Sequence, residues 1–172
     1  MKNIGSRQIV LYGILAAAAL VLGYVESLIQ LPAFIPGMKL GLPNLAVIAA
    51  LYLIDIKSAI IINLVRIILS GILFGNIMSL AYSLSGGALS LIVMILLSRK
   101  DRFSVIAVSI AGGICHNIGQ MLVAVFVLQT KALAWYFLIL WFAGIISGAL
   151  IGILAGIIVS RLKKTKIFQV KK

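Results

Sequence analysis

Acidic residues are scarce in this sequence: Glu26, Asp55 and Asp101 are the three among 172 residues. Charged residues of both signs make up 10% of the chain and apolar residues 63%, whereas a soluble domain usually carries about a quarter charged residues. Such a chain has too little polar surface to face water on all sides. The composition predicts a membrane protein, whose polar side chains at membrane depth are the candidates for function.

Other scarcities exclude several kinds of chemistry. The single cysteine, Cys115, cannot form an internal disulfide, and it points away from its neighbour His116 on a helix, so a metal pair is not expected. The two aspartates form no Asp-rich run that would hold magnesium on a diphosphate. There is no Gly-Lys-Ser/Thr phosphate-binding loop either. We expect no enzyme activity, no catalytic residues, no cofactor and no metal.

Six apolar runs predict an all-α integral membrane protein with six transmembrane helices. Five runs meet or nearly meet the length of about 20 residues that a spanning helix needs, and the second is short. The runs are continuous rather than alternating, which disfavours strands. No linker divides the chain, so we expect one membrane domain, 1–172, with a basic tail at 161–172. The expected helices are 6–28, 41–54, 57–75, 76–98, 103–129 and 133–160.

Basic residues predict the orientation. With the N-terminus in the cytoplasm, twelve of the fifteen basic residues lie inside and only Lys39 and Lys131 lie outside, as the positive-inside rule requires. The net charge of +12 thus reflects membrane topology rather than nucleic-acid binding. We expect both termini to be cytoplasmic. The twelve are Lys2, Arg7, Lys57, Arg99, Lys100, Arg102, Arg161, Lys163, Lys164, Lys166, Lys171 and Lys172.

All three prolines lie in the first outer segment, 30–44, at positions 32, 36 and 43. Proline blocks a continuous helix, although Pro43 can begin the second one, where its missing N–H is harmless. The segment is either a connector or a semi-rigid lid over an outward-facing cavity. A second irregularity, Ser85-Gly86-Gly87, is expected to interrupt the fourth helix.

Arg66 is the most unusual polar residue. It lies nine residues beyond Lys57, about 14 Å along a helix and so near mid-membrane. Glu26 is expected near the outer end of the first helix, about 14 Å away along the membrane normal, so no acid is expected to reach Arg66. Asn63 lies on the same helix face. Arg66 is then held either by amides and helix ends or by an anionic ligand.

The fifth helix carries a second polar patch. His116 and Gln120 are four residues apart and Asn117 and Gln120 are three apart, so the three share one face. The patch is either a set of ordinary hydrogen-bonded residues or part of a binding site. Polar residues also gather toward the outer half of the bundle, which suits a cavity that opens outward. The predicted substrate-binding residues are Glu26, Lys39, Asn44, Asn63, Arg66, Asn76, Tyr82, His116, Asn117 and Gln120.

Four stretches carry a resemblance to a known family. They are PGMKLGLPNL (36–45), LVRIILSGILFG (64–75), YSLSGG (82–87) and GGICHNIGQ (112–120). Together they resemble the Gx transporter family, also labelled heptaprenyl diphosphate synthase component I, over about residues 7–160. That family is similar to the substrate-binding S components of energy-coupling factor (ECF) transporters.

The resemblance implies a six-helix subunit of the bacterial plasma membrane that captures a small molecule from outside. Arg66, rather than the resemblance, suggests that this molecule carries an anionic or strongly accepting group. A separate transmembrane coupling protein and a pair of ATPases would be its partners. Gly13 and Ala17, which have small-xxx-small spacing on the first helix, are the implied contact with the coupling protein. The alternative is a non-transporting membrane component of an isoprenoid, quinone or flavin-linked extracellular electron-transfer pathway, as the family's label suggests.

Overall fold

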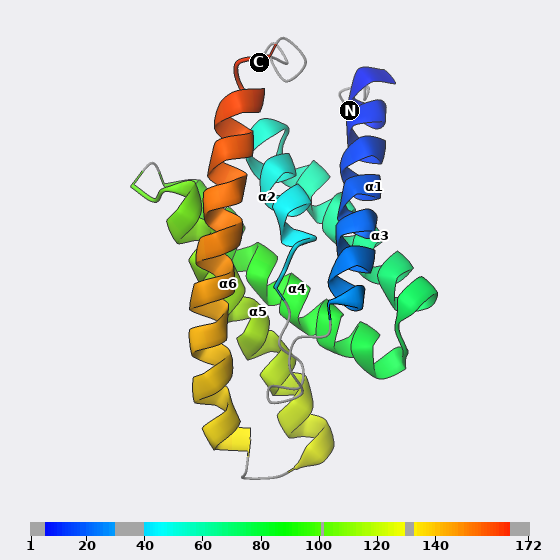
Figure 1. Cartoon of the computed structure of the whole chain (residues 1–172), viewed down its shortest axis with the longest axis vertical. Coiled ribbons are helices and arrows are strands. Elements are labelled where there is room, and N and C mark those ends of the chain that lie inside the picture. The colour runs from blue at the N-terminus through cyan, green and yellow to red at the C-terminus, as the bar shows by residue number, and fades with distance from the viewer. Residues whose placement is uncertain (1–5, 30–39, 101, 130–132, 166–172) are drawn as a thin grey trace.

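The computed structural model describes residues 6–29, 40–100, 102–129 and 133–165. Within these ranges the chain forms six helices and no strand, which confirms the predicted all-α bundle (Figure 1). Five helices are long and apolar enough to cross a membrane, and α2 is shorter. The helices are α1 (Ser6–Leu28), α2 (Asn44–Leu53), α3 (Ile56–Phe74), α4 (Ile77–Ser98), α5 (Val105–Leu128) and α6 (Leu133–Leu162).

Short polar residues fix where several helices begin. Asp55 precedes α3, accepts a hydrogen bond from the backbone N–H of Ser58 at 2.7 Å and forms a capping box with that serine. Asn76 accepts from the N–H of Ser79 at the start of α4, and Ser104 caps α5 in the same way. Each cap satisfies a backbone donor that has no partner inside its helix. The connections α2–α3, α3–α4 and α4–α5 can therefore be very short.

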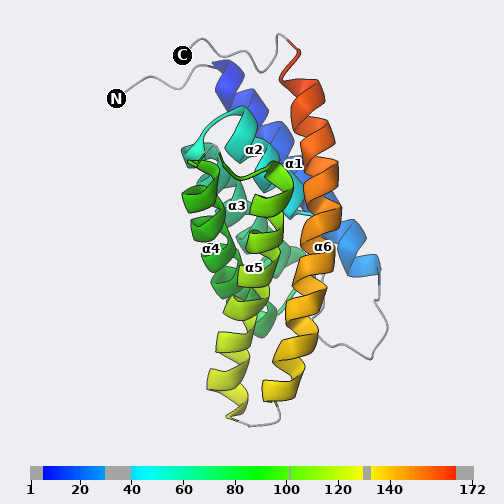
Figure 2. The ribbon, with the colours of Figure 1, turned by 90° about the vertical axis from the view of Figure 1, so that its left-hand side faces the viewer.

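The helices run alternately up and down the bundle. The start of α1 and the end of α6 lie at one end, whereas the end of α5 and the start of α6 lie at the other (Figures 1 and 2). Helix α5 packs between α4 and α6, and α1 lies against α2 and α3. The largest fully buried side chains include Ile48 of α2, Ile62 of α3, Met94 of α4 and Val108 of α5. One apolar core thus joins the two groups of helices.

Helix α2 is the exception to full-length spans. Its ten residues cover about 15 Å, half of a hydrocarbon core of about 30 Å. Pro43 precedes it with helical angles, φ −61° and ψ −25°, in agreement with the expected role of this proline. Because α2 is a half-length helix, its N-terminal end lies within the depth of the bundle, where it can face a buried site.

Glycines let α5 approach both neighbours closely. A methyl group added at Gly119 would lie 2.6 Å from the carbonyl oxygen of Ser85, and one added at Gly148 would lie 2.7 Å from the Cα of Ile110. Helix α4 is continuous through Gly86, so the expected interruption at 85–87 is wrong. The glycines there serve backbone-to-backbone packing of an unbroken helix, as in other membrane bundles.

Candidate functional site

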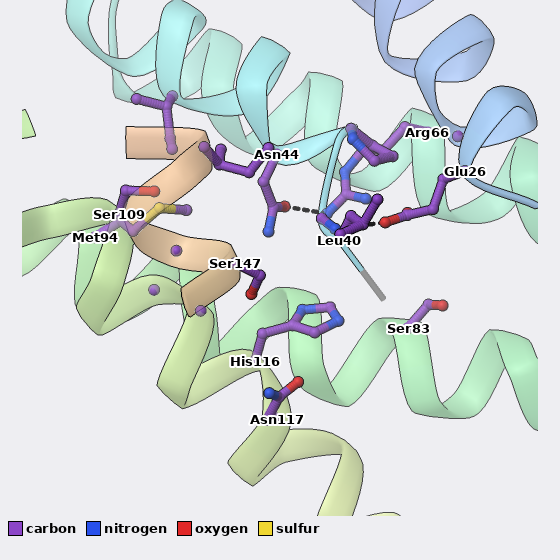
Figure 3. Close-up of a pocket in the computed structure, with 18 of the residues that line it drawn as sticks. Glu26, Leu40, Asn44, Arg66, Ser83, Met94, Ser109, His116, Asn117 and Ser147 are labelled. Carbon is purple, nitrogen blue, oxygen red and sulfur yellow. Dashed lines mark hydrogen bonds between the residues drawn. The ribbon is translucent and has the colours of Figure 1, made fainter. Parts of the chain in front are cut away.

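A cavity of about 100 Å³ lies inside the bundle, and residues from all six helices line it (Figure 3). By this measure one water molecule needs about 10–15 Å³, so the cavity has room for several waters or one small molecule. Its lining is unusually polar for the interior of a membrane bundle. The polar lining residues are Glu26, Asn44, Arg66, Ser70, Ser83, Ser109, His116, Asn117 and Ser147.

Arg66 is buried and its guanidinium is held by two asparagines. Its Nε and Nη2 donate to Oδ1 of Asn63 at 3.0 and 2.7 Å, and Nη2 also donates to Oδ1 of Asn44 at 2.8 Å. Asn63 is in turn fixed, because its Nδ2 donates to the carbonyl oxygen of Gly87 on α4 at 3.2 Å. These bonds use Nε and Nη2, and a guanidinium carries two further donors on Nη1. The geometry orients the charge without consuming all of its donors.

Glu26 lies beside this arginine (Figure 3). The carboxylate of Glu26 attracts the Arg66 charge electrostatically, and it accepts a hydrogen bond from the backbone N–H of Gly41. Helix counting therefore overestimates the separation of Glu26 from Arg66, since the two residues line one cavity and interact electrostatically. The reason is the path of the chain: Gly41, with φ +75°, turns the backbone between the end of α1 and the start of α2. The hydrogen bond from Gly41 to Glu26 joins the end of α1 to the residues just before α2, and both line the cavity with Arg66.

The α5 patch divides between the cavity and the packing around it. His116 and Asn117 both line the cavity, and Nδ2 of Asn117 donates to the carbonyl oxygen of Leu140 on α6 at 2.6 Å. The backbone of His116 lies against α4, since a methyl group at Gly86 would meet its carbonyl oxygen at 2.7 Å. Gln120 is buried but is not part of the lining. Two of the three predicted α5 residues thus reach the cavity.

The far end of the cavity was not predicted from the sequence. Ser109 of α5 and Ser147 of α6 line it together with Met94 and Gly112. A methyl group at Gly112 would lie 2.8 Å from the Sδ of Met94, so that glycine leaves room for the methionine. The sequence feature that could have indicated this end of the cavity is a serine three residues from a glycine, which occurs on both α5 and α6. The pairs are Ser109 with Gly112 and Ser147 with Gly144. That pattern is too common in membrane helices to single out a site.

Three further predicted substrate-binding residues lie apart from the cavity lining. Asn76 is exposed and caps α4, and Tyr82 is half-buried but is not among the lining residues. Asn63 stands behind Arg66 rather than on the cavity wall. Lys39 lies outside the described residues.

Gly13 and Ala17, the predicted partner contact, are exposed on α1. A methyl group added at Gly13 would meet no atom within 4 Å. The described part of the chain holds no group of three His, Cys, Asp or Glu side chains that could bind a metal ion.

The comparisons with known proteins give one family. The family model for heptaprenyl diphosphate synthase component I matches residues 15–158. Comparisons with curated proteins and with solved structures gave no significant match. The matched range contains α2 to α5 whole, most of α1 and α6, and every residue that lines the cavity. The chain therefore belongs to the heptaprenyl diphosphate synthase component I family, the same family that its motifs resemble.

Proposed function

We propose that this chain is the substrate-binding membrane subunit of an ECF-type transporter and takes up a small molecule through an outward-facing cavity. The observation that carries the proposal is the polar cavity around Arg66. An arginine at membrane depth is expensive and usually marks a substrate or ion pathway. Here it is oriented by Asn44 and Asn63 while the space beside it stays open, which is the arrangement of a binding site.

The half-length helix α2 supports the same function. Pro43 and Asn44, at its N-terminal end, line the cavity. Transporters commonly place a half-helix end against a midplane substrate, because the end carries a partial charge and free backbone groups. The hydrogen bond that Nη2 of Arg66 donates to Oδ1 of Asn44 at 2.8 Å ties this helix end to α3. A substrate that contacts Asn44 would therefore also affect the position of Arg66, and a substrate that contacts Arg66 would affect Asn44.

The proposed partners follow from the resemblance to S components. This chain has no phosphate-binding loop and so would rely on a separate coupling protein and a pair of ATPases for energy. We place the subunit in the bacterial plasma membrane with both termini in the cytoplasm. Gly13 and Ala17 on the exposed face of α1 are the proposed contact with the coupling protein.

Native mass spectrometry of the tagged protein, gently extracted from the cells that make it, tests the proposal. The wild type is expected to carry a small-molecule adduct and to bring nucleotide-binding subunits with it. Arg66→Ala is expected to lose the adduct, and Asn117→Ala to weaken it. The matched control is Asn76→Asp, which lies outside the cavity and keeps an oxygen to cap α4. An adduct that persists unchanged in Arg66→Ala would refute the proposed binding role.

The family's description favours a second candidate. A component named for heptaprenyl diphosphate synthesis would be a non-transporting membrane partner in an isoprenoid, quinone or flavin-linked pathway. It would lack a catalytic role of its own, since the aspartates form no Asp-rich run and Asp55 caps α3. In the same experiment this alternative predicts co-isolated prenyltransferase or redox proteins and no effect of Arg66→Ala on their association.

A further inference from the structure

Two buried serines at the far end of the cavity have unused hydrogen-bonding capacity. Ser109 is 3% exposed and Ser147 is 8% exposed, and both line the cavity. Within the described part of the chain, Oγ of Ser109 forms no hydrogen bond, and Oγ of Ser147 donates to the carbonyl oxygen of Gly144 at 3.5 Å. Hydrogen bonds between a hydroxyl and an oxygen are normally about 2.7–2.8 Å long, so this one is weak. Because buried polar groups are usually hydrogen-bonded, a partner for these hydroxyls is expected inside the cavity.

The two serines lie at the same level of the bundle. A methyl group at Gly148, the residue after Ser147, would lie 2.9 Å from the carbonyl oxygen of Ser109. One added at Gly152 would lie 2.9 Å from the Cβ of Ser109. The backbones of α5 and α6 therefore approach each other closely here, and they bring both serines to one end of the cavity.

A third hydroxyl adjoins this end from α4. Ser90 is 1% exposed, and its Oγ is buried with no hydrogen-bond partner among the described residues. A methyl group at Gly112, which lines the cavity, would lie 3.1 Å from that oxygen. Because Gly112 has no side chain, Oγ of Ser90 lies directly behind the cavity wall. A buried hydroxyl without a partner is unfavourable, and packing of the helices alone does not require three of them at one place.

The far end differs in character from the side of the cavity at Arg66. Figure 3 shows Ser109 and Met94 on one side of the view, and Arg66 and Glu26 on the other. Met94 and Ile151 add apolar surface to the lining. A charged ligand group placed against hydroxyls and apolar side chains would lose its water without gaining an opposite charge. A serine hydroxyl both donates and accepts, so it suits an uncharged polar group.

From these buried hydroxyls we infer a second binding position, at the far end of the cavity, where Ser109 and Ser147 bind an uncharged hydrogen-bonding group of the substrate. A hydroxyl, a carbonyl or an amide forms this class. The substrate then carries at least two polar groups, one bound at Arg66 and one bound by the serines. The inference rests on the proposed function and describes what the same cavity recognises at its other end.

Pairs of short carboxylates test the inference on the full-length protein in lipid nanodiscs. The probes are the straight-chain carboxylates from propanoate to hexanoate, each compared with the carboxylate of the same length that carries a terminal hydroxyl. The carboxylate suits the guanidinium of Arg66, and the hydroxyl suits the serines. Ligand-observed NMR titration gives each Kd, and empty nanodiscs correct for binding to lipid. At least one hydroxylated probe is expected to bind about fivefold tighter than its partner, or more.

Two serine variants locate this preference. Ser109→Ala and Ser147→Ala are each expected to weaken binding of the hydroxylated probe about fivefold and to leave the unsubstituted carboxylate nearly unchanged. That retained affinity also shows that each variant is folded. The matched control is Ser160→Ala, which changes an exposed serine of α6 whose hydroxyl donates to the carbonyl oxygen of Ile157 outside the cavity. This control should keep the full preference.

Three results would overturn the inference. The first is equal affinity within every pair, as expected if water alone satisfies the serines. The second is no detectable binding of any hydroxylated probe to the wild type. The third is an equal loss of both members of a pair in the serine variants, which would mean that Ser109 and Ser147 only support the fold.

The same titrations separate this inference from the proposed function. If the carboxylates bind, Arg66→Ala abolishes that binding and the hydroxyl adds nothing, the transport subunit stands and the serine position falls. If the hydroxyl preference depends on the serines but no coupling or nucleotide-binding subunit associates with the chain, the serine position stands and the transport proposal falls.

Discussion

Asn63 orients the guanidinium of Arg66, although its own side chain does not line the cavity. Its Oδ1 accepts two of the three hydrogen bonds that hold Arg66, and its Nδ2 joins α3 to Gly87 of α4. In Asn63→Ala, the buried guanidinium would keep only the bond to Asn44. Leaving buried donors of a charged group unsatisfied is unfavourable by about 1–3 kcal/mol. We expect the free energy of unfolding to fall by about that amount, together with weaker binding of any compound that the wild type holds.

Denaturation in detergent measures this effect. Asn63→Asp restores an acceptor for the guanidinium and should recover much of the stability lost in Asn63→Ala. Ser83→Ala, which changes a cavity-lining residue of α4, is the matched control and should stay close to wild type in stability. Equal stability of Asn63→Ala and wild type would mean that Arg66 does not depend on this amide.

Some residues of the cavity can be predicted from the sequence and others cannot. Arg66, His116 and Asn117 were predicted because polar side chains are rare at membrane depth and were located by counting along each helix. The approach of Glu26 to Arg66 was missed, because helix counting does not follow the turn at Gly41. Ser109 was missed since serine is ordinary in membrane helices. Predicting such neighbours requires the rotation of each helix, which apolar runs do not encode.

The contact between α4 and α5 sets the position of His116. A methyl group at Gly119 would lie 2.6 Å from the carbonyl oxygen of Ser85 and 2.7 Å from the Cα of Gly86, so two backbones would have to separate. Gly119→Ala is expected to lower the free energy of unfolding by about 1–3 kcal/mol. Because His116 is carried on the displaced helix, ligand affinity should fall as well.

Gly156→Ala provides the matched control for this element. A methyl group at Gly156 of α6 would meet no atom within 4 Å, so the substitution should be neutral or slightly stabilising, as glycine is a poor helix former. Thermal denaturation of both variants in the same detergent compares them. If the two alanine variants have the same stability, α4 and α5 are not as closely packed as the structure shows.

The limits of the helices were predicted closely, since basic residues, prolines and short polar residues interrupt the apolar runs. Helix α1 begins and ends where expected, and α3 to α6 agree within two residues at each end. The second helix is shorter than predicted and starts at Asn44, three residues after the expected start. The reason is that the apolar run at 41–43 includes the turn at Gly41 and Pro43, and apolar residues in a turn look like helix in a hydropathy pattern.

At the scale of the whole molecule, an even number of passes places both ends of the chain on one side. The start of α1 and the end of α6 share one end of the bundle (Figures 1 and 2). Most basic residues belong to the segments predicted at this end, so the positive-inside rule predicts that this end faces the cytoplasm. The short α2 is the element on which this topology depends, because its ten residues span only about half of the hydrocarbon core.

Single-cysteine labelling in cells tests this topology. In a Cys115→Ala background, Arg99→Cys and Lys163→Cys should react with a membrane-impermeant maleimide only after the cells are opened. Gln129→Cys, which replaces the residue that caps the end of α5, should react in intact cells, because the end of α5 lies at the opposite end of the bundle (Figure 1). The Cys115→Ala protein without added cysteine is the blank.

If Arg99→Cys and Lys163→Cys react from opposite sides of the membrane, the chain does not cross the membrane twice between these two positions. If both react in intact cells, the orientation is the opposite of the predicted one. With that orientation, a cavity whose mouth faces away from the basic end would open toward the cytoplasm. It could not take up a molecule directly from outside the cell.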